Sequence, residues 1–203
     1  EMPRITPLTV AELTPEARVA LNYAEDTMRF VPNDALILAR WPELLTALQP
    51  LVHVIYKPGE LPRSLKGMMA TVVSGAAGCR YCQAHTALGA MQGADASAEK
   101  VAAVWQFRES PLFSAAERAA LEFALAAGQQ PNGVTDEHFA RLREHYGERA
   151  ILEMVGLIAL FGFLNSWNDT VATPLEAAPL EFARKNLRPE DWTPGKHVGG
   201  GAA

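Results

Sequence analysis

Three side chains capable of redox chemistry fall within seven residues, in the segment GCRYCQAHT. Cys79 and Cys82 are three positions apart, and His85 follows three positions later. Residues three apart are neighbours on a helix, so the sulfurs can meet and the imidazole can reach Cys82. A helix N-terminus favours thiolate, which predicts a lowered thiol pKa. The segment therefore predicts dithiol chemistry, in which one thiolate attacks a peroxide or disulfide and the second thiol closes an intramolecular disulfide.

Metal binding and a purely structural role are the alternatives for this segment. Zinc could take the two cysteines and His85, but a structural zinc site needs four ligands. The remaining histidines are scattered along the chain, and no βαβ pattern supports a thioredoxin-type fold. Two buried cysteines beside an incidental histidine would have no chemical role. The dithiol interpretation predicts no metal and no organic cofactor.

Composition limits the class of protein. The chain has 203 residues, a net charge of −5 and 49% hydrophobic residues, which suits one globular domain. An acidic chain without basic runs is a poor partner for nucleic acid or for a membrane surface. The longest apolar run has eleven residues, 154–164, and is too short to span a bilayer, which takes ~20. With no visible signal peptide and only two cysteines, we expect a cytoplasmic protein.

Helix signals are dense, and no segment has clear strand alternation. Thr14-Pro15-Glu16 is typical of a helix start, and Ser114 with Glu117 forms a capping-box pattern. Pro50 should kink or split its helix. The prediction is an all-α protein with a disordered tail over 191–203. The expected helices cover 15–29, 34–40, 42–56, 61–77, 79–90, 95–107, 114–129, 135–147, 148–169 and 180–187.

Two apolar segments resemble each other at an offset of 86 residues. GMMATVVSGAAGCRYCQ starts at Gly67, and EMVGLIALFGFLNSWND starts at Glu153. In this alignment the two cysteines correspond to Asn165 and Asn168. The similarity predicts two related helical units, about 31–107 and 114–176, in one domain covering 1–190. Chance similarity between two buried helices is the alternative.

The segments VPNDALILARWPELLTAL, LPRSLKGMMATVVSGAAGCRYCQAHT and AILEMVGLIALFGFLNSWNDTVATPLE resemble the alkylhydroperoxidase D-like branch of the carboxymuconolactone decarboxylase family. The resemblance covers most of residues 31–176. It implies an all-α fold of two related units, a homo-oligomer, and reduction of hydroperoxides by the CxxC pair. An electron-donor protein or small thiol would recycle the enzyme. The decarboxylase branch typically lacks the cysteines.

The resemblance also implies residue roles. Cys82, beside the histidine, would form the sulfenic acid, and Cys79 would resolve it or pass the proton. Family members usually carry a glutamate twelve residues before the first cysteine, which feeds a proton relay through the histidine. Here that position is Gly67, so we expect a weakened relay or space for a bulkier substrate or a water. Glu153 holds the matching position of the second unit, and could face the same cavity or have a structural role. Tyr81 is a possible accessory residue or a cavity wall.

Three hypotheses follow from these residues. The first is an antioxidant-type oxidoreductase, a dithiol peroxidase or disulfide reductase acting on hydroperoxides through Cys79, Cys82 and His85. The second is a carboxymuconolactone decarboxylase-like enzyme acting on a small lactone or acid, with His85 as general base. The third is a non-catalytic thiol sensor.

Overall fold

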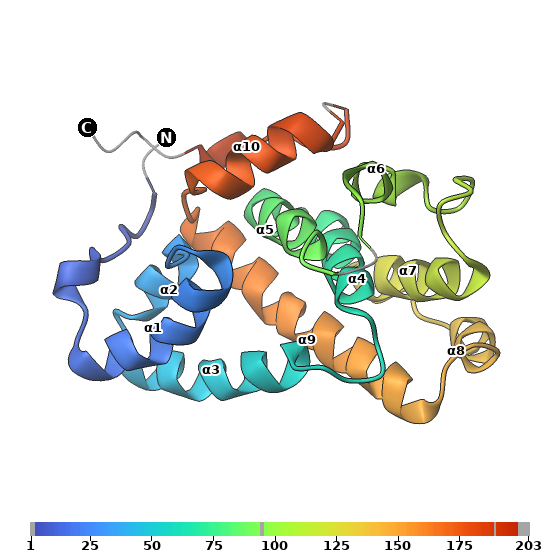
Figure 1. Ribbon diagram of the computed structural model, residues 1–203, viewed down its shortest axis with the longest axis horizontal. Helices are drawn as coiled ribbons and strands as arrows, with labels where there is room; N and C mark the ends of the chain where they lie inside the picture. Colours follow the sequence, from blue (N-terminus) through green and yellow to red (C-terminus); the bar gives the residue numbers. More distant parts are fainter. Residues whose placement is uncertain (1–2, 94–95, 189, 199–203) are drawn as a thin grey trace.

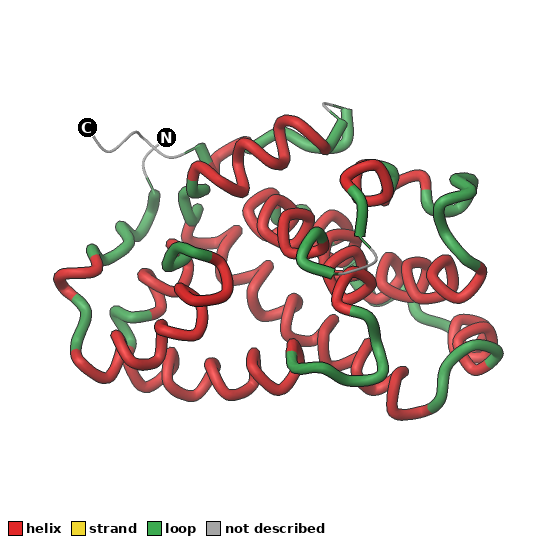
Figure 2. Tube along the Cα trace, in the orientation of Figure 1, coloured by secondary structure: helices red, strands yellow, loops and turns green. Residues whose placement is uncertain are grey.

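The computed structural model describes residues 3–93, 96–188 and 190–198, and throughout these it contains helices and loops without strands (Figure 2). The prediction of an all-α fold is confirmed. The α-helices are α1 (Pro15–Met28), α2 (Asn33–Leu38), α3 (Pro42–Tyr56), α4 (Arg63–Ala76), α5 (Arg80–Ala90), α6 (Ala98–Ala102), α7 (Ala115–Ala127), α8 (Asp136–Arg143), α9 (Glu148–Val171) and α10 (Ala177–Asn186). Short 3₁₀ turns cover Val10–Glu12, Val104–Gln106 and Gly195–His197.

Local capping chemistry sets several helix starts. The Thr14 side chain accepts a hydrogen bond from the Ala17 N–H, and the Ser114 side chain from the Glu117 N–H, as their sequence patterns predict. Pro50 does not split its helix, because α3 runs from Pro42 to Tyr56 through this proline.

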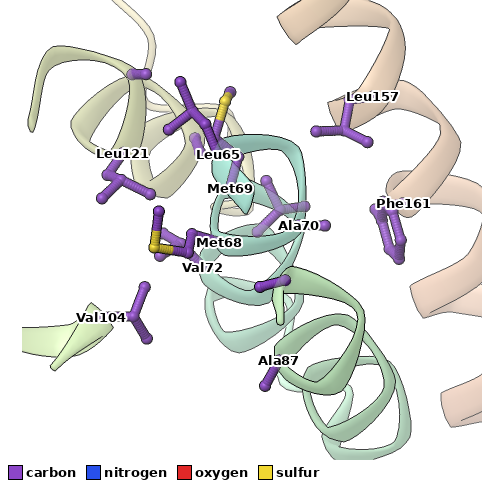
Figure 3. Close-up of a cluster of buried hydrophobic side chains, with 14 of the residues drawn as sticks. Leu65, Met68, Met69, Ala70, Val72, Ala87, Val104, Leu121, Leu157 and Phe161 are labelled. Carbon is purple, nitrogen blue, oxygen red and sulfur yellow. The ribbon is translucent and has the colours of Figure 1, made fainter. Parts of the chain in front are cut away.

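Helices α4 and α5 form a tight antiparallel pair at the centre of the molecule, packed against α7, α9 and α10 (Figure 1). The main core lies between these helices and includes Leu65, Met69, Leu121, Leu157 and Phe161 (Figure 3). It anchors both arms of the α4–α5 pair, so the segment that carries the cysteines is rigidly supported.

Close contact between α4 and α5 depends on glycine. A Cβ atom added to Gly67 would lie 2.5 Å from Cα of Ala90 on α5, far inside normal contact distance. The pair turns at Gly78, which has a positive φ of 78° that favours glycine. The Cys79 N–H donates to the Ser74 carbonyl at 2.9 Å, and α5 begins directly afterwards.

Helix α9 corresponds to the α4–α5 pair at the 86-residue offset, yet it is continuous for 24 residues. It is the one described helix that is long and apolar enough to cross a membrane by length and composition. In this structure it runs diagonally across the molecule and packs against α4 and α5 (Figure 1). One side of α9 is buried, and the other exposes apolar residues that include Leu152, Val155 and Phe163.

A smaller hydrophobic cluster holds α1, α2 and α3 together, with Leu21, Leu36 and Leu45 among its buried members. On another side of α5 lie α10 and the segment after it, where the Trp192 indole N–H donates to the Arg80 carbonyl at 3.0 Å. The sequence predicted disorder from 191 onward. Residues 191–198 instead pack on the fold, with His197 fully buried, and 199–203 lie outside the described residues.

Candidate functional site

Both cysteines are buried free thiols at the start of α5, with exposed fractions of 0% for Cys79 and 3% for Cys82. Cys79 is the N-cap residue, and its Sγ accepts a hydrogen bond from the Cys82 N–H at 3.4 Å. The free N–H of the helix start is therefore directed at the sulfur of Cys79. Cys82 lies one turn inside the helix.

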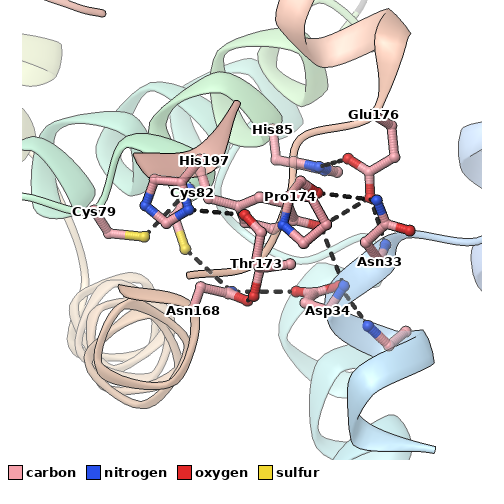
Figure 4. Close-up of polar contacts among 12 residues, drawn as sticks. Asn33, Asp34, Cys79, Cys82, His85, Asn168, Thr173, Pro174, Glu176 and His197 are labelled. Atoms are coloured by element: carbon pink, nitrogen blue, oxygen red, sulfur yellow. Dashed lines mark hydrogen bonds and ion pairs between the residues drawn. The ribbon is translucent and has the colours of Figure 1, made fainter. Parts of the chain in front are cut away.

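The Cys82 sulfur has a polar partner on α9. Nδ2 of Asn168 donates to Cys82 Sγ at 3.4 Å and lies 3.3 Å from Oδ2 of Asp34 on α2 (Figure 4). Thr173 donates its hydroxyl hydrogen to Asn168 Oδ1 at 2.7 Å, which fixes the orientation of the amide. Asn168 and Cys82 are the residues that correspond at the 86-residue offset.

The thiol pKa of Cys82 is raised rather than lowered. Burial is the main cause, the neighbouring Cys79 adds to it, and the hydrogen bond from Asn168 opposes it. Burial also raises the pKa of Asp34, although the charge of His85 opposes this. The expected lowering fails because Cys82 is enclosed by the fold and does not occupy the capping position.

His85, one turn after Cys82, has a carboxylate partner. Its Nε2 lies 2.6 Å from Oε2 of Glu176, which directly precedes α10. The other oxygen of Glu176 accepts from the Tyr81 hydroxyl at 3.0 Å and from the Asn33 backbone N–H (Figure 4). The Tyr81 and His85 rings pack with their centroids 4.4 Å apart.

This carboxylate controls the charge on the imidazole. Burial alone would lower the pKa of His85, but Glu176 and, more weakly, Asp34 outweigh it and raise the pKa. Burial would likewise raise the pKa of Glu176, but the charge and hydrogen bond of His85 outweigh it and lower the pKa. The two residues form a largely buried pair in which the carboxylate favours the protonated form of the imidazole.

A pocket of about 190 Å³ opens beside these groups. It lies between the α1–α3 cluster and the α5–α9 wall, and its surface is mainly apolar, with Phe30, Leu48 and Phe161 among its lining residues. Cys82 and His85 also line it, whereas Cys79 does not. Of the two cysteines, Cys82 is therefore the one in contact with the pocket.

The structure brings Cys79, Cys82, His85 and Tyr81 together, but it does not bring Glu153 to them. The Glu153 carboxylate pairs with Lys66 Nζ at 3.2 Å and with Arg149 Nε at 3.2 Å, and it is absent from the pocket lining. Its role is structural. Gly67 also has a packing role, because the contact with α5 leaves no space for a side chain.

Three polar residues of this site were missed from sequence: Asp34, Asn168 and Glu176. The 86-residue offset paired Asn168 with Cys82, which was a usable signal. Glu176 had no such signal, because the family resemblance places the carboxylate partner of His85 before the cysteines and not 91 residues after the histidine. Among the described residues, no group of three or more His, Cys, Asp or Glu is arranged to hold a metal ion.

Comparison with solved structures shows close relatives. The debrominase Bmp8 is 34% identical, with a TM-score of 0.83 over 89% of this chain and 96% of that one. A variant of Bmp8 has been solved in complex with 2,3,4-tribromopyrrole. A peroxidase-related protein from Ralstonia eutropha JMP134, described as an alkylhydroperoxidase AhpD core, shares the fold. Its TM-score is 0.77 and its identity 23%, over 90% of this chain and 95% of that one.

Sequence comparisons agree with this relationship. The uncharacterized protein YnjA of Escherichia coli K12 is 35% identical over 98 residues, which are 48% of this chain and 53% of YnjA, so the match spans about half of that relative. The profile of the carboxymuconolactone decarboxylase family matches residues 42–126. This chain belongs to the carboxymuconolactone decarboxylase family.

Proposed function

We propose that this protein is a dithiol reductase that reduces organic hydroperoxides, with Cys82 as the attacking thiol and Cys79 as the resolving thiol. The observation that carries the proposal is the position of Cys82 in the wall of an apolar pocket, with Cys79 behind it on the same helix and His85 beside it. An apolar pocket favours an organic hydroperoxide over hydrogen peroxide.

The chemistry balances with these residues. Cys82 first releases its proton to solvent, from which His85 regains a proton after the reaction. The thiolate attacks the terminal oxygen of the hydroperoxide, so that an S–O bond forms and the O–O bond breaks. Protonated His85 gives its proton to the departing alkoxide, and the product is an alcohol. Cys79 then attacks the sulfenic acid of Cys82, forming the disulfide and releasing water. An external dithiol supplies two electrons to restore both thiols.

Glu176 has a defined part in this scheme. By raising the pKa of His85 it keeps the imidazole protonated, which suits a general acid for the leaving group. It replaces the glutamate that family members usually carry at the position of Gly67. Proton transfer through His85 therefore does not depend on a carboxylate at position 67.

The likeness to Bmp8 favours a second candidate, reductive removal of bromide from an aromatic ring. The same dithiol would supply the two electrons. The Cys82 thiolate would take bromine from carbon, the carbon would be protonated, and Cys79 would displace bromide to form the disulfide. The apolar pocket suits a halogenated ring as well as an alkyl hydroperoxide.

Single-turnover measurements separate these candidates. Pre-reduced protein is mixed with one equivalent of cumene hydroperoxide or of a tribromopyrrole, and mass spectrometry follows Cys79 and Cys82. We expect one equivalent of cumyl alcohol per disulfide formed. Cys82→Ser should abolish the reaction, and Cys79→Ser should stop it at the Cys82 sulfenic acid.

Three outcomes would contradict the proposal. Bromide release without hydroperoxide reduction would select the second candidate. Activity on a lactone that survives loss of both cysteines would favour the decarboxylase hypothesis, with His85 as base. Oxidation without any turnover in the presence of dithiothreitol would indicate a thiol sensor.

A further inference from the structure

The pocket extends along the α4–α5 pair and away from the reacting sulfur. Near the cysteines, Thr71 on α4 bonds to Thr86 on α5 through their hydroxyls at 2.9 Å. Farther along, Arg63 in the first turn of α4 bonds to the side-chain amide oxygen of Gln92. Arg63 and Gln92 both line the pocket, at the end opposite Cys82.

Arg63 carries a positive charge that the described part of the chain does not neutralise. None of the ion pairs among the described residues includes it. It also occupies the first position of α4, whose first turn contains no acidic residue and no side-chain cap. A cation is unfavourable at this positive end of a helix dipole, and a bound anion would reverse that effect.

Charge is distributed unevenly along the pocket. Near the start of α5 the lining includes Cys82, the carboxyl group of Asp34 and His85, whose charge is paired with Glu176, whereas the Arg63 guanidinium lies at the start of α4, near the end of α5. Tyr56 lines the wall as well. Burial raises the pKa of the Tyr56 hydroxyl. The charge of Arg63 opposes this rise, and a charge on Cys82 adds to it, so Tyr56 lies within the electrostatic influence of both residues. An elongated ligand with one anionic end would enter with that end at Arg63.

We propose that the substrates of this pocket carry a carboxylate at the end remote from the reacting group, and that Arg63 binds this carboxylate as the residue determining specificity. The inference rests on the proposed reductase function. Arg is suited to the role because its planar guanidinium binds carboxylate through two parallel hydrogen bonds. Apolar side chains such as Leu48, Val52 and Leu160 contact the body of the substrate.

The required length follows from helix geometry. Cys82 and Gln92 are ten residues apart on and just beyond α5, so they are separated by about 15 Å along its axis. The Arg63 side chain extends over part of this span. A ligand that contacts both ends therefore measures roughly 10 Å from its carboxylate to its reacting oxygen, as in a medium-chain hydroperoxy acid.

The test compares two nearly isosteric probes, 8-hydroperoxyoctanoate and 8-hydroperoxyoctanamide, with wild type, Arg63→Gln and Arg63→Lys. For wild type we expect kcat/KM to favour the carboxylate by about tenfold to hundredfold, mostly through KM. Arg63→Gln should lower the carboxylate value to that of the amide, so that the preference between the two probes is lost. Arg63→Lys should retain part of the preference, and the exposed control Arg141→Gln should retain all of it.

Failure of the inference is distinguishable from failure of the function. If wild type reduces both probes equally, or if Arg63→Gln slows both alike, the carboxylate site is refuted while the reductase function stands. If neither probe oxidises the dithiol, the proposed function fails. Calorimetry with octanoate and octanamide then decides on the site: tighter octanoate binding that is lost in Arg63→Gln supports it, and equal binding overturns it.

Discussion

Replacing Glu176 by glutamine tests how the charge of the His85 imidazole is maintained. The carboxylate lies 2.6 Å from His85 Nε2 and also accepts from Tyr81 and from the Asn33 backbone. Glutamine preserves the size of the side chain and one acceptor oxygen, but removes the negative charge. The burial that lowers the pKa of His85 would then act without its main opponent, so the pKa of His85 should fall and less of the imidazole should be protonated.

Two magnitudes follow. The side chains of His85 and Glu176 are only 12% and 14% exposed, so removing one charge from the pair should lower the free energy of unfolding by about 3 kcal/mol. Loss of the protonated imidazole removes the general acid, which should slow hydroperoxide reduction about a hundredfold at pH 7.

The pH dependence of stability has a definite sign. The folded pKa of His85 is raised, so its stabilising contribution is complete below the ordinary value of 6.5 and is lost as the pH rises through the folded pKa. The folded pKa of Glu176 is lowered, so its contribution is present above the ordinary value of 4.5 and is lost as the pH falls. Glu176→Gln should remove both dependences, and its deficit should be largest between these two values.

The assay combines urea unfolding at pH 5.5 and pH 9 with single-turnover reduction of cumene hydroperoxide. Glu153→Gln is a matched control, because that carboxylate is also largely buried and paired with cations, but lies away from the pocket. The control should lose stability and keep the wild-type rate. If Glu176→Gln reduces hydroperoxide within twofold of wild type at pH 7, the assigned role of the pair is refuted.

Three further predictions concern packing, thiol reactivity and assembly. Gly67→Ala should lower the free energy of unfolding by about 1–3 kcal/mol, because the new Cβ would lie 2.5 Å from Ala90 Cα. A variant as stable as wild type in urea would contradict this packing role. Asn168→Ala should slow iodoacetamide alkylation of Cys82 about tenfold at fixed pH, because the hydrogen bond that lowers the thiol pKa is lost. An alkylation rate with the same pH dependence as in wild type would count against this role of Asn168. The exposed apolar side of α9 leads us to expect a homo-oligomer, so light scattering should give a multiple of 22.0 kDa for wild type and a smaller mass for Phe163→Glu. A monomeric wild type at micromolar concentration would refute this expectation.

The parts of the fold that depend on local chemistry were predictable from sequence. The capping box at Ser114 and Glu117 determines where α7 starts through local hydrogen bonds, whatever the helix packs against. Pro50 shows the limit of such reasoning, because local sequence signals a break and the helix nevertheless continues through it. Packing against neighbouring helices can compensate for the single hydrogen bond that a proline removes.

The site was predictable only where its residues are close in sequence. The spacing of Cys79, Cys82 and His85 on one helix carried most of the chemistry. Glu176 reaches His85 from 91 residues further along the chain, and Asn168 reaches Cys82 from 86 residues away. Contacts of this kind depend on the whole fold. The absence of a glutamate at position 67 therefore does not show whether another part of the chain supplies a carboxylate to His85.

The late position of Glu176 has a consequence during protein synthesis. Ribosomes extend chains at about 5–20 residues per second, so Glu176 emerges from the exit tunnel roughly ten seconds after His85. The segment that covers the outer side of α5, including Trp192, emerges later still. Throughout that interval the nascent chain holds two cysteines on an incompletely packed helix, exposed to cellular oxidants before the acid that completes their site exists. Oxidation of the ribosome-bound chain by any passing oxidant is therefore a hazard, which folding limits by burying Cys79 and leaving Cys82 in contact only with the pocket.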